Sequence, residues 1–158
     1  MEARTLLKDR RALVTGAGSG IGAAVARALA GADAKVTVAD VDSRSAAGIA
    51  EEIGGEPWVL DLTDTGALDS LSLDYDILVN NAGFQHVSPI EDFPPETFRR
   101  MLTLMLEAPF LLTRAACRTC TSQVSDGSST SPPCTVSGPH RSSRRTSLPS
   151  TGWRVCPR

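Results

Sequence analysis

The sequence lacks any apolar run long enough to span a bilayer, and no basic segment leads into an apolar one at its start. These absences argue against a membrane-spanning protein and a secretory signal, so we expect a cytoplasmic protein with no membrane partner. Tyrosine and lysine are also scarce, because Tyr75 is the single tyrosine and no lysine follows Lys35. This shortage limits the proton-transfer chemistry that the chain can perform.

Charge and composition change at one point in the chain. Residues 1–116 hold 17 acids and 10 bases, whereas residues 117–158 hold only Asp126 against six arginines, together with all four cysteines and dense Ser, Thr and Pro. Leu148 is the only leucine or isoleucine of this second part, which is too little apolar content for a packed core. We therefore expect a folded domain over residues 1–116 and a disordered tail over residues 117–158.

A short apolar run, Leu13-Val14, breaks into glycines at Gly16 and then into an alanine-rich helical pattern from Gly20 to Ala30. The order of buried strand, tight turn and helix predicts a dinucleotide cradle, because a pyrophosphate needs close backbone approach and the positive end of a helix. A glycine turn that binds nothing is the alternative. The apolar helix residues, Ile21, Val25, Ala28 and Leu29, are spaced to lie against a sheet.

Acidic residues follow the next two predicted strands. Lys35–Ala39 ends at Asp40, about 20 residues past the glycines, where a carboxylate can bind the adenosine ribose and repel a 2′-phosphate. This placement favours NAD over NADP. The alternative is that Asp40 or Asp42 caps the helix Ser43–Ile53, and we assign the cap to Asp42 and the ribose to Asp40. Gly54-Gly55 end that helix, and the strand Trp58–Leu60 leads to Asp61.

A helix over residues 64–71 and the strand Asp76–Val79 follow, and that strand runs into Asn80-Asn81-Ala82-Gly83. This string and the earlier Thr15-Gly16-x-x-x-Gly20-x-Gly22 resemble the short-chain dehydrogenase/reductase family. The resemblance implies a Rossmann-type α/β fold with a doubly wound parallel sheet, of which four strands in the order 3-2-1-4 are present. It implies that the asparagines tie strand ends together and that NAD binds the following residues: Gly16, Ser19, Gly20, Ile21, Gly22, Asp40, Asp61, Leu62, Asn81, Ala82 and Gly83.

The segment that begins at Phe84-Gln85-His86 is similar to that of bacterial 3-hydroxybutyrate dehydrogenases within the same family. That similarity implies that Gln85 binds the carboxylate of a small hydroxy-acid substrate and that His86 lines the pocket. A polar loop without a ligand is the alternative.

Pro95 opens a predicted helix that runs to Ala116 with a kink at Pro109. Met105 lies where the family has an asparagine of a proton relay. The apolar side chains are expected in the core and in contacts between subunits, since the family is commonly homo-oligomeric: Phe98, Met101, Leu102, Met105, Leu112 and Ala116.

The family's catalytic serine, tyrosine and lysine, in a Y-x-x-x-K spacing, have no counterpart in this sequence, so we assign no catalytic residue. A complete protein of this kind has about 250 residues. Restoring one C before the Cys117 codon opens a second reading frame that can encode N-I-S-S and Y-x-x-x-K. We therefore interpret residues 117–158 as a frameshift product. A zinc site at Cys117, Cys120, Cys134, His140 and Cys156, or nucleic-acid binding by Arg141–Arg145, is a weaker reading.

Two functions remain open at this point. The first is NAD-dependent oxidation of a small hydroxy acid, 3-hydroxybutyrate to acetoacetate. The second is a non-catalytic, NAD-binding fragment or an inert product, because the cradle is present and the proton-transfer residues are not. No metal and no nucleic-acid partner are expected.

Overall fold

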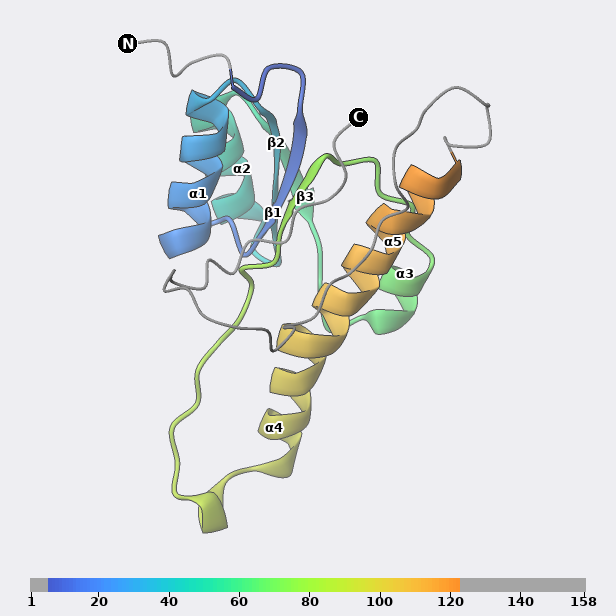
Figure 1. The fold of residues 1–158 in the computed structure, drawn as a ribbon. Helices are drawn as coiled ribbons and strands as arrows, with labels where there is room; N and C mark the ends of the chain where they lie inside the picture. The colour runs from blue at the N-terminus through green and yellow to red at the C-terminus, as the bar shows by residue number, and fades with distance from the viewer. Residues whose placement is uncertain (1–5, 123–158) are drawn as a thin grey trace, which may run out of the picture.

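The computed structural model describes residues 6–122 of the chain, with side chains as far as Arg118. Helices and strands alternate along the sequence (Figure 1). Their bounds are β1 Arg11–Thr15, α1 Gly20–Gly31, β2 Lys35–Asp40, α2 Ser43–Ile53, β3 Glu56–Val59, α3 Thr65–Asp69, β4 Ile77–Val79, the 3-10 helix η1 Ile90–Asp92, α4 Pro95–Leu102, the π-helix η2 Thr103–Glu107 and α5 Ala108–Ser122.

The four strands form one parallel sheet in the order β3-β2-β1-β4, which confirms the predicted fold class and strand order. β1 is central, and its Val14 lies opposite Val38 of β2 and Val79 of β4. Within the described residues β4 pairs with β1 alone, so its outer edge has no strand neighbour there. Parallel strands place all their carboxyl ends at one edge of the sheet, which is where ligands bind in open α/β folds.

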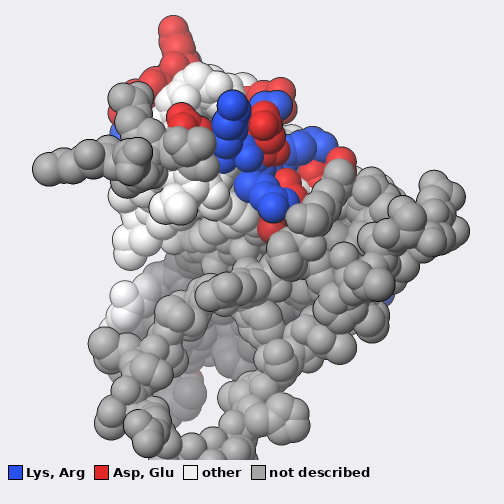
Figure 2. Space-filling model, turned by 45° about the horizontal axis from the view of Figure 1, so that its top comes forward, with Lys and Arg blue, Asp and Glu red and all other residues white. Residues whose placement is uncertain are grey.

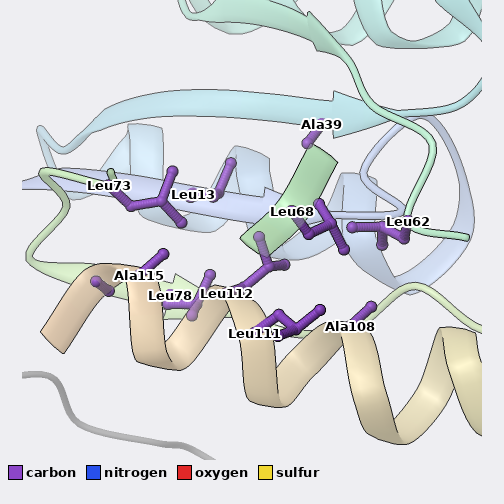
Figure 3. Packing of buried hydrophobic residues seen from close by; sticks show 11 residues of the cluster. Leu13, Ala39, Leu62, Leu68, Leu73, Leu78, Ala108, Leu111, Leu112 and Ala115 are labelled. Carbon is purple, nitrogen blue, oxygen red and sulfur yellow. The ribbon is translucent and has the colours of Figure 1, made fainter. Parts of the chain in front are cut away.

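Helices cover both faces of the sheet, with α1 and α2 on one face and α3 and α5 on the other (Figure 1). Neighbouring residues of β1 serve opposite faces, because Val14 packs with Ala26 of α1 while Leu13 packs with Leu112 of α5. Figure 3 shows Leu111 and Leu112 beside Leu68 of α3 between α5 and the sheet. The sheet is thus buried from both sides, which fits its apolar strands.

The face of α1 that meets the sheet is the predicted one in part, because Val25 and Leu29 pack against the core while Ile21 and Ala28 are exposed. Gly22, Ala23 and Ala26 are buried, whereas Ile21 is 77% exposed. Small side chains let the helix backbone approach the strands closely, and Ile21 in the first turn lies beyond them. The predicted bounds of β3, α3 and β4 were also off by one or two residues at several of their ends.

The predicted single helix from Pro95 begins where expected, but it is interrupted by a change of helix type just before Pro109. The chain forms a π-helical turn there, in which the N–H of Ala108 donates to the carbonyl of Thr103. Pro109 has no N–H to give to the carbonyl four residues earlier, so the preceding turn widens rather than breaking. α5 then continues to Ser122, past the predicted boundary at Ala116, and the remainder of the predicted tail lies outside the described residues.

Only part of the apolar face predicted for this helical region is buried. Leu112 and Ala116 are in the core, but Phe98 and Met105 are about half exposed, at 54% and 50%. The reason is geometric, because α4 and η2 extend beyond the sheet, where no helix or strand of the described residues covers their outer side (Figure 1).

The opposite edge of the sheet, at the amino ends of the strands, carries charges of both signs. Arg10 pairs with Asp76 and Arg11 with Asp74, each at 3.0 Å. Figure 2, turned so that the top of Figure 1 comes forward, shows basic and acidic side chains intermingled at this end. Because the charges alternate, this edge offers no field of a single sign to a charged ligand.

None of the helices in the described part of the chain is long and apolar enough to cross a membrane.

Candidate functional site

A cavity of about 570 Å³ lies at the carboxyl ends of the strands. It is formed by the segments that directly follow each strand and by one helical segment from later in the chain. Its lining residues are Thr15, Gly16, Ser19, Gly20, Ile21, Ala39, Asp40, Val41, Leu60, Asp61, Leu62, Thr63, Asn81, Ala82, Gly83, Phe84, Arg100 and Leu104. The structure thus brings together every predicted cofactor residue except Gly22, although these residues are spread from position 16 to position 83.

Gly16 makes the turn after β1 possible. Its φ of +62° lies in the left-handed region, and a Cβ there would lie 2.8 Å from the Cα of Ala82. The turn after β1 therefore approaches the backbone of Ala82, in the segment after β4, more closely than a side chain at position 16 would allow. Gly16 and Ala82 both line the cavity.

Gly22 serves packing rather than the cavity wall. A Cβ at this position would lie 2.2 Å from the carbonyl oxygen of Gly16 and 2.5 Å from Nδ2 of Asn81. The first turn of α1 consequently rests directly on the backbone of the glycine turn. In dinucleotide-binding turns, the last glycine likewise allows the helix to pack closely against the strand.

The amino end of α1 faces the cavity through Ser19, Gly20 and Ile21. The side chain of the N-cap residue, Ser19, makes no capping hydrogen bond, and the first turn contains no acidic residue. Within the described residues, neither a capping side chain nor a first-turn acid neutralises the N–H groups and the positive dipole at this helix end. Such an end is suited to a diphosphate.

Asp40 is held in the cavity wall by backbone donors from two sides. Its Oδ2 accepts from the N–H of Gly18 at 2.9 Å, and its Oδ1 accepts from the N–H of Asp42 at 3.0 Å. The helix cap belongs to Asp42, whose side chain accepts from the N–H of Arg44 and from the hydroxyl of Ser45, as predicted. The carboxylate of Asp40 therefore has a fixed orientation between the glycine turn and the start of α2.

Asp61 also has its carboxylate fixed, in this case by a turn. Its Oδ1 accepts from the hydroxyl of Thr63 at 2.7 Å and from the N–H of Thr63 at 2.8 Å. The Thr63 hydroxyl, the Thr63 N–H and the charge of Arg100, in that order, hold the pKa of Asp61 below its ordinary value. The group is an ionised acceptor at neutral pH. Leu62 beside it is 7% exposed and belongs to the core.

Thr15 and Asn81 tie the ends of β1 and β4 together. Oγ1 of Thr15 accepts from the N–H of Asn81 at 3.1 Å and from the N–H of Ala82 at 3.2 Å, and it donates to the carbonyl of Val79. Nδ2 of Asn81 donates to the carbonyls of Thr15 and Gly16, both at 3.1 Å. The predicted tie is confirmed for Asn81, while Oδ1 of Asn80 is buried without a hydrogen-bond partner in the described part of the chain.

The residues predicted for the substrate lie outside the cavity. Gln85 is exposed, and the ring of His86 meets Phe93 edge-on at 5.2 Å. Met105 lies beside Gly83: a Cβ added to Gly83 would lie 3.4 Å from Cε of Met105.

The lining residues that sequence reasoning did not assign to the site are Thr15, Ala39, Val41, Leu60, Thr63, Phe84, Arg100 and Leu104. Phe84 directly follows the N-N-A-G string, so its position was a signal. The sequence contained no comparable signal for Arg100 and Leu104, because their position depends on the path of residues 84–94.

A model of the short chain dehydrogenase family matches residues 10–128. D-beta-hydroxybutyrate dehydrogenase of Cupriavidus necator is 38% identical over 125 residues, covering 70% of this chain and 48% of that protein. Galactitol 2-dehydrogenase of Agrobacterium fabrum is 36% identical over 118 residues, covering 69% of this chain and 46% of that protein. The chain thus spans about half the length of the curated relatives it matches.

A solved structure has a similar fold. It is the 3-ketoacyl-(acyl-carrier-protein) reductase of Brucella melitensis complexed with NADH, which has 31% identity and a TM-score of 0.67 and covers 73% of this chain and 52% of that one.

Proposed function

The chain belongs to the short-chain dehydrogenase family, and on that basis we propose that its cavity binds NAD for the oxidation of a small hydroxy acid. The family is NAD(P)-dependent, so a nicotinamide dinucleotide is the cofactor against which the cavity is to be tested. The observation that carries the proposal is the meeting of an uncapped helix end, Asp40 and Asp61 around one cavity.

The residues present fit a dinucleotide from one end to the other. The amino end of α1 and the glycine turn are suited to the diphosphate, because no side chain intervenes at Gly16 or Gly20. Asp40 supplies an acceptor for ribose hydroxyls, and Asp61 supplies one for the amino group of adenine. Ala82 and Gly83 leave room for the nicotinamide ribose. When bound, the nicotinamide supplies a hydride acceptor.

Asp40 favours NAD over NADP. Its carboxylate lies at the end of β2 with no basic partner among its hydrogen bonds, since both of the donors described above are backbone N–H groups. A 2′-phosphate on the ribose would place negative charge beside this carboxylate.

For the substrate we propose 3-hydroxybutyrate, with acetoacetate as product. Support comes from the similarity to a relative named D-beta-hydroxybutyrate dehydrogenase. Gln85, which the resemblance assigns to the substrate carboxylate, is exposed and directly follows Phe84 of the cavity lining. A relative named galactitol 2-dehydrogenase is almost as similar, so a polyol is the competing substrate class. A cytoplasmic location fits either reaction.

A second candidate is a chain that binds NAD without turning it over. Its basis is the sequence itself, in which Tyr75 is the single tyrosine, no lysine follows Lys35, and Y-x-x-x-K does not occur. Our frameshift interpretation of residues 117–158 accounts for this composition. Sequencing the gene across the Ala116 codon tests it, because codons incompatible with the second frame would refute it.

One experiment separates the candidates. NADH formation from NAD is followed by absorbance with 3-hydroxybutyrate and, in parallel, with galactitol, using the 158-residue chain and a version whose reading frame is restored after Ala116. We expect NAD binding by the first protein and turnover of 3-hydroxybutyrate by the second only. Turnover by the 158-residue chain would eliminate the non-catalytic candidate, and a restored protein that oxidises only galactitol would overturn the hydroxy-acid proposal.

A further inference from the structure

Arg100 is the basic residue among those that line the cavity, where it joins the carboxylates of Asp40 and Asp61. It comes from α4 rather than from a strand end, so neither the glycine turn nor the N-N-A-G string indicates it. Its neighbour Arg99 is also exposed and lies in the same helical turn, but it does not line the cavity. The two arginines therefore have the same charge and are both exposed, and they differ in whether they line the cavity.

The guanidinium of Arg100 rests on an aromatic ring. Its Cζ lies 5.5 Å from the centroid of the Phe84 ring, within the range of a cation–π contact. Phe84 follows the N-N-A-G string directly and is itself part of the cavity lining. The ring restricts a long side chain that would otherwise sample many rotamers. A guanidinium is planar, so one that rests on a ring through one face can stack another flat group on its other face.

The charge of Arg100 also acts on Asp61. It is one of the causes that lower the pKa of that carboxyl, after the two hydrogen bonds from Thr63. Asp61 follows β3, at one edge of the sheet, while Phe84 follows β4 at the other edge. Arg100 thus lies within electrostatic reach of the carboxylate although it is supported from the other side of the cavity.

The position of the base follows from the two carboxylates. The diphosphate site at α1 and the ribose site at Asp40 set a direction along the carboxyl edge of the sheet, from β1 through β2 toward β3. The next group along that direction in a dinucleotide is adenine, which then lies beside Asp61. Resting on the proposed function, we infer that Arg100, held on Phe84, forms the outer wall of the adenine subsite and stacks its guanidinium against the bound base.

The test measures binding of ADP-ribose, which carries the adenine half of the cofactor, to the 158-residue chain by calorimetry. Arg100→Ala is expected to weaken binding about three- to fivefold, the range of an exposed cation–π contact. Arg100→Lys keeps the charge without the planar group and is expected to recover only part of the loss. Phe84→Leu removes the supporting ring and is expected to weaken binding similarly. Arg99→Ala is the matched control and is expected to leave the affinity unchanged.

Thermal unfolding of each variant checks that it is folded. Equal losses in Arg99→Ala and Arg100→Ala, or full recovery in Arg100→Lys, would overturn the stacking role and leave only a general effect of charge. Failure of the unmodified chain to bind ADP-ribose would instead overturn the proposed function, and the role of Arg100 with it.

Discussion

The carboxylate of Asp40 accepts a hydrogen bond from the backbone N–H of Gly18 at 2.9 Å, which links the end of β2 to the glycine turn after β1. A Cβ on Gly18 would lie 2.9 Å from Oδ2 of Asp40 and 2.6 Å from the Cβ of Ser45. The glycine turn, to which we assign the diphosphate, and Asp40, to which we assign the ribose, are therefore positioned by each other. A change at Asp40 is expected to alter both parts of the cofactor site.

Replacement of Asp40 by Asn tests its role in choosing the cofactor. The amide keeps the shape but removes the negative charge, so NAD loses a charge-assisted hydrogen bond and NADP loses a repulsion. We expect the ratio of NAD to NADP affinity to fall by about tenfold, since a hydrogen bond to a charged group contributes about 1.5 kcal/mol or more. Titration calorimetry with both dinucleotides measures the ratio. Glu51→Gln, on the exposed face of α2, removes the same charge away from the cavity and should leave the ratio unchanged.

Replacement of Thr15 by Val tests the tie between β1 and β4. Thr15 is 1% exposed, and its loss would leave the N–H groups of Asn81 and Ala82 without their acceptor. We expect the free energy of unfolding to fall by about 2–3 kcal/mol. Thr37→Val is the control, because Thr37 is also buried but accepts one hydrogen bond, from the Tyr75 hydroxyl, and should cost about 1 kcal/mol. Equal urea midpoints for the two variants would contradict the proposed tie.

The sequence was sufficient for the parts of the fold that depend on local pattern. The apolar strands, the cap at Asp42 and the end of α2 at Gly54 followed from residue type and spacing, whereas the strand order followed from the family resemblance. The placement of Arg100 did not, because it depends on how the loop after Gly83 carries α4 back over the cavity. The π-helical turn before Pro109 could not be predicted from the residue pattern either, because a proline can interrupt a helix in more than one way.

Burial was the other quantity that pattern did not determine. Ile21 and Met105 are apolar residues at helical spacing, and both are exposed because nothing in the described part of the chain covers them. The apolar pattern identifies the helix faces that can be buried. Which of these faces are buried depends on how far the sheet extends beneath each helix.

The cap at Asp42 predicts how stability depends on pH. The hydrogen bond from the Ser45 hydroxyl, and then that from the Arg44 N–H, hold the pKa of Asp42 below its ordinary value of 3.8. A carboxyl with a lowered pKa in the folded state contributes stability above its ordinary pKa and loses it as the pH falls through the folded value. Unfolding by urea is therefore expected to become easier as the pH falls from about 5.

Asp42→Asn retains an oxygen for the cap but removes the titrating group, so the pH dependence should become shallower in that range. Glu51→Gln removes a carboxylate from the same helix without touching the cap and should keep the slope of the unmodified chain. If the Asn variant has the same slope as the unmodified chain below pH 5 or so, the cap is not the source of the dependence.

Gly22 and Gly48 are both helical glycines, and the structure predicts opposite effects for their replacement by Ala. A Cβ on Gly22 would lie 2.2 Å from the carbonyl oxygen of Gly16, an atom of the backbone that cannot move aside without opening the glycine turn. Gly22→Ala is expected to lower the free energy of unfolding by about 3 kcal/mol and to weaken NAD binding, because the turn is part of the proposed diphosphate site.

A Cβ on Gly48 of α2 would meet nothing within 4 Å. Gly48→Ala should therefore raise stability by about 0.5–1 kcal/mol through the unfolded chain, with unchanged NAD binding. Urea unfolding and calorimetry of the two variants side by side measure both effects, and a Gly22→Ala variant with normal stability and normal NAD affinity would show that α1 does not rest on the glycine turn as described.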